Sequence, residues 1–546
     1  MRAAGLSATL LILVFLAANH PDVHARSPVL QLPTTGEQQR SSAPAKLPAP
    51  DKIVEAYLKA IGGKKRVAAI RDASFEWAIL DKDSRIGSAT TKIRAPASVR
   101  SEIAYPTGQE VAAANAASAW MRDRDGNLRT LTGDEAKSAR LQSLLQASQL
   151  VDYKKLTVLA RSLSVVDAES EPAYVVEFSM RNGARLRYWF SVSSKFLIRI
   201  EDDARQMITK FSDYRSQSTM AGILQPHRVS VSSRGASSLT FLLERTTYNQ
   251  GLPVAAFDPP RGADALDIVK LLREVSGNQD ELDIRFTEYA FLQKETDHEI
   301  NNKGEVKKET TKVFEVFPIA NRAPVKKLIS ENGVMLSGER LAKETRRVEE
   351  EFEKAERDKE KNQLRADKHR AEREQKKAKR SGEEVESDDD VTIALFLKVH
   401  DFVSPRIERF RGRDAVVFDF RVRPKFKPGN RKESLISKLV GVAWIDPVDK
   451  QVIRLEAKLA EEFKMAGGLL LNLRPGAGFM MEQMRVAEGL WLPRLSQINL
   501  SVKVFMISGG DFNKTLEWSD YKHFGSDVKD FKLDTPKPTI ESSPNP

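Results

Sequence analysis

The chain contains no cysteine among its 546 residues. This absence excludes disulfides, thiolate metal sites and thiol nucleophiles together. Catalytic motifs are missing as well: there is no G-x-S-x-G elbow, no H-E-x-x-H, no Walker loop and no dinucleotide fingerprint. Beyond residue 25 no two histidines stand four residues apart, and His227 corresponds to Arg494 in the internal repeat described below. We therefore predict no catalytic residue, no metal site and no cofactor, and we expect that the protein is not an enzyme.

The charge of the chain is only moderately positive, +11 at pH 7. A basic balance suits contact with anionic lipid or an acidic partner, and it also promotes solubility. The segment 406–432 carries many cations interleaved with phenylalanines, which could meet lipid phosphates or could simply be the outer face of a strand. No nucleic-acid recognition motif is present, so we expect no nucleic-acid partner.

The N-terminus has the pattern of an export signal. Arg2 precedes an apolar run over residues 6–18, and Val23-His24-Ala25 supplies small residues at the cleavage positions. The run is shorter than the ~20 residues that a membrane-spanning helix needs. We expect residues 1–25 to be a signal peptide cleaved near Ala25. Residues 26–50 and 535–546 are rich in polar residues and proline, which predicts a disordered linker and tail.

Three landmarks of the chain occur twice, which indicates two domains of one fold. The separation of the copies grows along the chain from 215 to 255 and then 267 residues, and a charged block lies within the first increase. A period this long is far beyond that of a solenoid repeat. The paired landmarks are Ile53-Val54 with Ile268-Val269, Ile198-Arg199-Ile200-Glu201 with Ile453-Arg454-Leu455-Glu456, and Gly222-Ile223-Leu224-Gln225-Pro226 with Gly489-Leu490-Trp491-Leu492-Pro493.

The sequence predicts an α+β fold with domains at 51–262 and 263–534. Each domain opens with a short amphipathic helix, at 51–60 and 266–275, and continues mainly as alternating strands. Helical spacing returns only at 134–151 in the first domain, and 392–399 has a strand-like composition in the second. An antiparallel sheet of so many strands tends to curl towards a barrel.

A block of mixed charges at 339–390 is inserted into the second domain. Spacings such as Glu350 to Lys354 favour a solvated helix. The block is either a self-supporting solvated helix or a projecting arm that contacts a partner protein. Its apolar stripe fades after Leu341, Val348 and Phe352, so a coiled coil is poorly supported.

Aromatic and apolar residues in or beside the predicted strands are the candidates for a ligand cavity. Any one of them could equally be ordinary core packing, because a curved sheet either fills itself or encloses a ligand. The segment 465–481 could be an apolar flap over a cavity or against a membrane, or a buried hairpin connection. The cavity candidates are Trp77, Trp189, Phe190, Trp444, Trp491, Leu469, Leu470, Phe479 and Met480.

Several of these features together resemble the exported LolA/LolB-type carriers and the outer-membrane lipoprotein-sorting proteins. The resemblance rests on strand and turn signatures: the helix that ends at Gly62-Gly63, the strand 188–190 with 195–201, and the segment 222–228. In the second domain, Trp444-Ile445-Asp446-Pro447 follows the same pattern. The family fold is an open antiparallel β-half-barrel wrapped around helices, with an apolar cavity for acyl chains.

The resemblance implies two tandem half-barrels in the periplasm, with the charged helical insertion in the second. It further implies that the protein binds a lipid or the acyl chains of a lipoprotein, for transfer towards the outer membrane. The alternative is an envelope sensor or scaffold whose charged arm contacts a partner protein. The sequence does not identify the ligand, nor whether one or both domains bind it.

Overall fold

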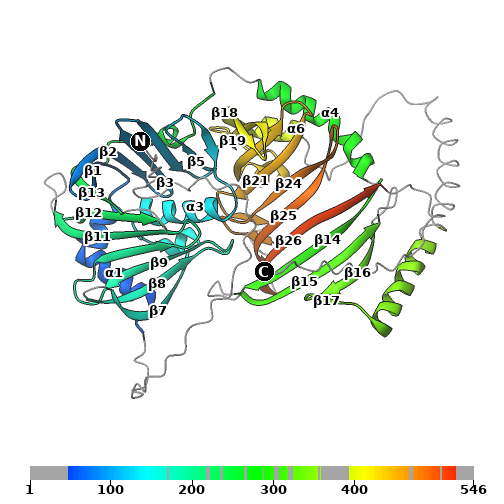
Figure 1. The fold of residues 1–546 in the computed structure, drawn as a ribbon, viewed down its shortest axis with the longest axis horizontal. Coiled ribbons are helices and arrows are strands. Elements are labelled where there is room, and N and C mark those ends of the chain that lie inside the picture. The colour runs from blue at the N-terminus through cyan, green and yellow to red at the C-terminus, as the bar shows by residue number, and fades with distance from the viewer. Residues whose placement is uncertain are drawn as a thin grey trace, which may run out of the picture.

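The computed structural model of the chain consists mainly of two large antiparallel sheets that lie side by side (Figure 1). The predicted signal peptide, most of the linker and charged block, and the tail lie outside the described residues. Among the described helices, none is both long and apolar enough to cross a membrane. The structure describes residues 47–168, 171–216, 222–233, 238–262, 267–286, 288–300, 306–317, 324–354, 357, 393–465, 471–504 and 507–523.

The first sheet has thirteen strands, in the order β6-β5-β4-β3-β2-β1-β13-β12-β11-β10-β9-β8-β7. The chain thus folds outward in hairpins from β1 to one edge, crosses over, and folds back to pair β13 with β1. The strands are β1 (Asp72–Asp81), β2 (Ser84–Arg94), β3 (Ser98–Tyr105), β4 (Gly108–Ala114), β5 (Ala119–Arg122), β6 (Leu128–Thr130), β7 (Leu159–Ala168), β8 (Glu171–Ser179), β9 (Arg185–Ser191), β10 (Leu197–Asp202), β11 (Met207–Ser216), β12 (Leu224–Ser233) and β13 (Leu239–Tyr248).

The second sheet follows the same plan, in the order β17-β16-β15-β14-β26-β25-β24-β21-β20-β19-β18. Its last strand, β26, pairs with its first, β14, as β13 pairs with β1. The hairpin of β22 and β23 is an addition that lies off this path. The strands are β14 (Tyr289–Ile300), β15 (Val306–Phe317), β16 (Val325–Glu331), β17 (Val334–Met335), β18 (His400–Phe410), β19 (Arg413–Val422), β20 (Leu439–Asp446), β21 (Gln451–Leu459), β22 (Phe463–Met465), β23 (Leu471–Leu473), β24 (Gly478–Ala487), β25 (Leu490–Val504) and β26 (Ile507–His523).

The repeated landmarks occupy matching strands. The first copy of the Ile-Arg-Ile-Glu motif lies on β10 and the second on β21, and each pairs with the aromatic strand before it. The two Gly-to-Pro motifs lead into β12 and β25. Both sheets are open and antiparallel, which agrees with the predicted half-barrels.

Helices cover one face of each sheet, and the longest helix of the first domain lies inside the curve of its sheet (Figure 1). That helix, α3, fills the crossover between β6 and β7, and residues 338–354 form a helix in the corresponding crossover of the second sheet. The helices are α1 (Pro50–Ala60), α2 (Lys64–Ala68), α3 (Gly133–Ala147), α4 (Ile268–Phe286), α6 (Ile393–Val399) and α7 (Arg431–Ile436), with short 3₁₀ turns at Tyr153–Leu156 and Val254–Phe257.

Two sequence expectations in the second domain were wrong. Residues 393–399 form the helix α6 rather than a strand, because a segment that begins with five consecutive apolar residues has no period that separates the two states. The second helix was predicted to end at residue 275, but α4 continues through Gly277 to Phe286. Its counterpart α1 ends before Gly62-Gly63, as expected.

The start of the charged block is docked on the second sheet. Val348 and Phe352 are buried against Ala290, Phe317 and Val325 of the strands β14 to β16. The predicted apolar stripe is therefore a packing surface, and the remainder of the block lies outside the described residues.

Gly62 and Gly222 allow the end of α1 to meet the start of β12. A Cβ atom at Gly62, whose φ is 126°, would stand 2.2 Å from the carbonyl oxygen of Gly222. The amide of Leu224 donates to the carbonyl of Ile61 at 2.9 Å just beyond this contact. No L-side chain fits in this space, so the glycines of the resemblance motif have a direct steric reason.

Buried polar groups join the two domains. The Arg406 side chain is 1% exposed, and its guanidinium pairs with Glu408 at 2.6 Å and Asp419 at 3.1 Å in the second domain. Glu408 accepts from both the amide and the hydroxyl of Thr130 in the first domain, at 2.7 and 2.6 Å. Ser118 donates to Asp419 at 2.5 Å. Burial of these charges is tolerated because each is paired and hydrogen-bonded across the boundary.

We expect Arg406→Met to destabilise the protein by about 3–5 kcal/mol, because it leaves two buried carboxylates without a cation. Chemical denaturation measures this change. The control is Arg409→Met, which breaks the exposed pair with Asp414 and should cost no more than about 1 kcal/mol. Equal effects of the two variants would contradict the assigned role of Arg406.

A second link between the domains predicts an acid-dependent loss of stability. Arg140 of α3 donates to Glu456 of β21 at 2.7 Å. Burial alone would raise the pKa of Glu456, but the charges and hydrogen bonds of Arg140 and Arg454 lower it to about 2. A carboxyl group whose pKa is lower in the folded than in the unfolded protein stabilises the fold at any pH above its unfolded pKa. This stabilisation is lost as the pH falls from the unfolded pKa towards the folded pKa. We expect the free energy of unfolding of the wild type to be higher than that of Glu456→Gln by up to about 3 kcal/mol at neutral pH.

This difference should shrink as the pH falls from about 4.5 towards about 2, and unfolding titrations of both proteins across that range measure it. The other carboxylates titrate in both proteins, so their contributions cancel in the difference between the two free energies of unfolding. A difference that stays constant with pH would contradict the ionised Glu456.

Candidate functional site

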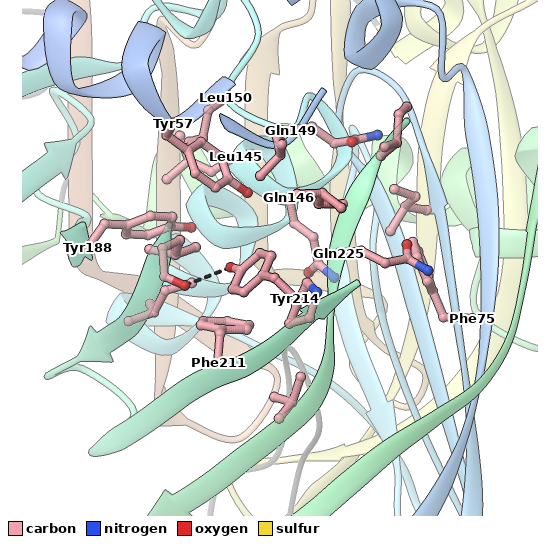
Figure 2. A pocket seen from close by; sticks show the side chains of 18 of the residues that line it. Tyr57, Phe75, Leu145, Gln146, Gln149, Leu150, Tyr188, Phe211, Tyr214 and Gln225 are labelled. Carbon is pink, nitrogen blue, oxygen red and sulfur yellow. Dashed lines mark hydrogen bonds between the residues drawn. The ribbon is translucent and has the colours of Figure 1, made fainter. Parts of the chain in front are cut away.

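The first sheet and its helices surround a half-open cavity of about 160 Å³. Figure 2 shows side chains converging on it from α1, the C-terminal half of α3, and the strands. Its lining is largely aliphatic and aromatic, with a few amides and phenolic hydroxyls. The lining residues are Tyr57, Ile61, Phe75, Trp77, Ile93, Gln142, Leu145, Gln146, Gln149, Leu150, Tyr188, Leu197, Ile200, Phe211, Tyr214, Ile223, Leu224, Gln225, Pro226, Val229 and Tyr248.

The helix α3 forms a wall of the cavity because Gln142, Leu145 and Gln146 recur at helical spacing on one side of it, and Gln149 adds to this wall just after the helix ends. Leu145 is 1% exposed, and Figure 2 shows Gln146 reaching from the helix towards Tyr214. The helix presents its polar amides to this space together with leucine. The cavity therefore offers hydrogen-bonding groups within an apolar surround.

An irregular residue in β11 lets two aromatic rings reach the same cavity. Asp213 adopts a left-handed backbone with a φ of 58° and makes no strand pairing, although the register does not shift there: Ser212 faces Arg228 and Tyr214 faces Pro226. With regular alternation, Phe211 and Tyr214 would point to opposite faces of the sheet. Both instead line the cavity.

Tyr214 is fixed by its ring and its hydroxyl. The ring stacks on Phe196 with centroids 4.2 Å apart, and the hydroxyl donates to the carbonyl of Leu197 at 2.6 Å (Figure 2). Burial raises the pKa of Tyr214 well above its ordinary value. The phenol therefore stays neutral and serves as a wall of the cavity.

Gln225 has its amide fully engaged on the other side of the cavity. It accepts from Tyr248 at 2.7 Å and donates to the hydroxyl of Thr246 at 2.7 Å. Burial raises the pKa of Tyr248 to about 12. These groups are satisfied within the protein and have no need of a ligand.

Two other polar atoms of the lining residues are buried without a hydrogen-bond partner in the described part of the chain. They are the indole Nε1 of Trp77, a donor, and the Oε1 of Gln146, an acceptor. An unsatisfied buried polar group costs about 1–3 kcal/mol. A ligand with a polar group beside its apolar portion would suit this pair better than a pure hydrocarbon.

The structure places the other predicted cavity residues of the first domain behind or away from this space. Phe190 is 1% exposed and packs behind the wall, with its ring 5.4 Å from that of Tyr57. Trp189 points to the opposite face of the sheet, where it packs on Ala173 and Val175. Of the predicted set, only Trp77 is among the residues that line this cavity.

In the second domain the predicted residues are spread over two places. Trp444 and Trp491 pack together in one buried cluster, and Trp491 donates to Asp449 at 2.8 Å. Phe479, which is 39% exposed, and Met480 line a separate cleft between the domains. Leu469 and Leu470 lie outside the described residues. Their contacts with a ligand stay predictions.

The face of the second sheet that corresponds to the cavity is filled by helices. Ile268, Leu271 and Leu272 of α4 pack on Phe418 and Ile445 of the strands, and Leu397 of α6 adds to the same cluster. The two sheets share a strand order, but in this region they differ in how the concave face is occupied.

Among the residues that the structure describes, no three histidine, aspartate or glutamate side chains are grouped so that they could hold a metal ion. His400 is fully buried and packs in a ring cluster with Phe396 and Phe420. Burial lowers the pKa of His400, which favours its neutral form. His400 is thus a core residue where α6 packs against β18.

No protein-family model and no curated protein matches the chain. Three solved structures show what it is similar to. A DUF1329 family protein from Desulfovibrio piger is 14% identical, with 38% of this chain and 96% of that chain covered at a TM-score of 0.27. A domain assigned to the outer membrane lipoprotein-sorting proteins of Vibrio parahaemolyticus is 11% identical, with 38% and 96% covered and a TM-score of 0.27.

A LolA superfamily protein from Nitrosomonas europaea is 11% identical, with 39% of this chain and 99% of that chain covered at a TM-score of 0.28. The resemblance noted from the sequence is therefore also found when structures are compared.

We expect Tyr214→Phe to destabilise the protein by about 1 kcal/mol, because the buried carbonyl of Leu197 loses its donor. Tyr214→Leu should cost about 1 kcal/mol more, since the stacking on Phe196 is lost as well. Denaturant unfolding of both variants measures these steps. An unchanged stability of Tyr214→Phe would mean that the hydroxyl does not hold the wall in place.

Proposed function

We propose that the protein is an exported, periplasmic, non-catalytic carrier that shelters an acyl chain in the cavity of its first half-barrel. The observation that supports this function is a half-open, largely apolar cavity of about 160 Å³ lined mainly by aromatic and aliphatic side chains. The resemblance of the sequence motifs to lipoprotein-sorting carriers supports the same reading. In this function the chain belongs to a lipid or a lipoprotein, which the protein passes towards the outer membrane.

The size of the cavity limits how much of a ligand it can hold. An engineered protein cavity of ~150 Å³ accommodates a molecule the size of benzene. The cavity therefore suits the terminal portion of a single chain better than a whole lipid with several chains. The remainder of the ligand would lie outside, which fits a carrier that must release its cargo.

The unpaired Trp77 Nε1 and Gln146 Oε1 refine the chemistry of the ligand. A hydroxyl can accept from the indole and donate to the amide oxygen, whereas a hydrocarbon can do neither. We propose that the bound chain carries an oxygen function near its buried part.

Straight-chain alcohols of increasing length test the proposal by isothermal titration calorimetry. Each methylene buried contributes about 0.8 kcal/mol, so affinity should rise roughly fourfold per carbon until the cavity is full and then level off. Neutral alcohols are chosen because their binding does not depend on a cationic site.

Leu145→Phe narrows the cavity from the α3 side, where Figure 2 places Leu145. We expect the affinity series to level off at a shorter alcohol, with roughly fourfold or greater weakening of the longest ligands. The matched control is Val165→Phe, an addition of an aromatic ring at a position that is 47% exposed on β7. Binding that is absent from wild type, or unaffected by Leu145→Phe, would overturn the proposal.

A further inference from the structure

A second recess lies between the two domains, on the other side of α3. It consists of two adjoining cavities of about 120 and 480 Å³ that share Asn182, Gly476 and Asn499 in their linings. The first domain contributes the N-terminal half of α3 and the turn after β8. The second contributes β21 and the turn before β24. We refer to the two cavities together as the interdomain cleft.

The cleft is strongly cationic. Its lining includes seven lysine and arginine residues but only one acidic residue, Glu456. The cations come from five separate segments of both domains, so their clustering was not visible in the sequence. They are Lys137, Arg140, Lys154, Arg181, Arg454, Lys458 and Arg474.

Part of this charge is balanced by carboxylates. Arg140 and Arg454 both donate to Glu456, each at 2.7 Å, and Arg454 also pairs with Glu482. Glu482 is shared further with Arg411 and Arg494, so it is already outnumbered by cations.

The two cleft lysines of the first domain are also paired. Lys137 lies 3.0 Å from Asp134 of the same helix. Lys154 pairs with Asp51 at the start of α1. These two side chains therefore contribute little uncompensated charge to the cleft.

Among the described residues, Lys458 and Arg474 form no ion pair and no side-chain hydrogen bond. The Glu456 carboxylate that attracts Lys458 is already bonded to Arg140 and Arg454. Arg140 likewise has its Nε buried without an acceptor in this part of the chain. Burial lowers the pKa of Lys458 well below its ordinary value, and the nearby Arg140 lowers it further, while Glu456 opposes the change. Burial and the adjacent charge of Arg474 lower the pKa of Arg181 in the same way.

Strand geometry explains how these groups come to face one space. Arg454, Glu456 and Lys458 alternate along β21, so their side chains project from one face of the sheet. Gly478 of β24 faces Lys458 in the register, and a Cβ atom there would stand 2.8 Å from the Cα and 2.9 Å from the Cβ of Lys458. The absence of a side chain at Gly478 therefore leaves room beside Lys458.

We propose that the interdomain cleft binds a phosphate group, with Lys458, Arg474 and the free Nε–H of Arg140 as its donors. Arg474, together with a Lys458 that the bound anion holds in its charged form, would balance the two negative charges of a phosphate monoester or of inorganic phosphate at neutral pH. Arginine forks and a lysine point charge are the donors that proteins use for phosphate oxygens. The phosphate is either free in solution or part of a lipid headgroup.

The phosphate site is separate from the apolar cavity and does not depend on the carrier function. Lys137 and Arg140 face the cleft, whereas Leu145 and Gln146 face the cavity, so the body of α3 lies between the two. A loss of phosphate binding with intact alcohol binding, or the reverse, would distinguish the two proposals.

Calorimetry of the full chain in phosphate-free buffer tests the site, with sodium phosphate in one arm and the short-chain phosphomonoester lipid dihexanoyl phosphatidic acid in the other. Heat from sodium phosphate identifies free phosphate as a ligand. Heat from the phospholipid alone identifies a headgroup if Lys458→Met reduces it and Leu145→Phe does not. Lys458→Met should weaken the affinity for whichever of the two titrants binds the wild type roughly tenfold or more, because a charge-assisted hydrogen bond is lost. Lys427→Met, a change at an exposed lysine, should leave the affinity as it was.

A thermal readout separates a ligand-binding lysine from a structural one. Lys458→Met removes a repelled charge, so in phosphate-free buffer its melting temperature should match or exceed that of wild type, while the increase on adding ligand should shrink. Arg474→Gln provides a second variant with the same expected loss of affinity. The proposal is overturned if neither titrant binds wild type, or if wild type, Lys458→Met and Arg474→Gln bind equally well.

Discussion

A helix with two buried sides is the constraint on which both recesses of this protein depend. One side of α3 forms a wall of the apolar cavity through Leu145 and Gln146, and the other reaches the second domain through Arg140. A helix in close-packed surroundings cannot move by an ångström on one side without changing the contacts on the other. The shape of the cavity is therefore tied to the arrangement of the two domains.

The sequence predicted the repeated architecture well because its signals are local. Aromatic strands mark the core of each sheet. Gly62 and Gly222 act through backbone sterics, because a side chain at either position would collide with its neighbours. The cavity itself was predicted less well. The left-handed backbone of Asp213 interrupts the side-chain alternation of β11, so Phe211 and Tyr214 both line the cavity, which a regular period of two does not predict. The cationic cleft was missed because its members meet only after two domains pack, as with Arg140 and Lys458.

The two copies kept their strand order but diverged in what occupies the concave face. In the first domain, the crossover before β7 is the compact helix α3, which leaves a cavity beside it. In the second, the corresponding crossover starts with the helix at 338–354, whose Val348 and Phe352 are used to cover β14 to β16. The helices α4 and α6 then close the central strands. The first domain thus keeps a cavity beside its crossover helix, whereas helices cover the corresponding strands of the second domain.

In the proposed carrier function, the contacts that hold α3 in place also affect the release of the bound chain. The apolar cavity offers only as much binding energy as a short chain segment provides, about 0.8 kcal/mol for each methylene. A displacement of α3 that excludes one or two methylenes would therefore change affinity severalfold to tenfold. Because Arg140 connects the same helix to Glu456 and the cationic cleft, charge at the cleft can bias the position of α3. Coupling between two sites is reciprocal, so an anion that loosens the chain must itself be bound more weakly when the chain is present.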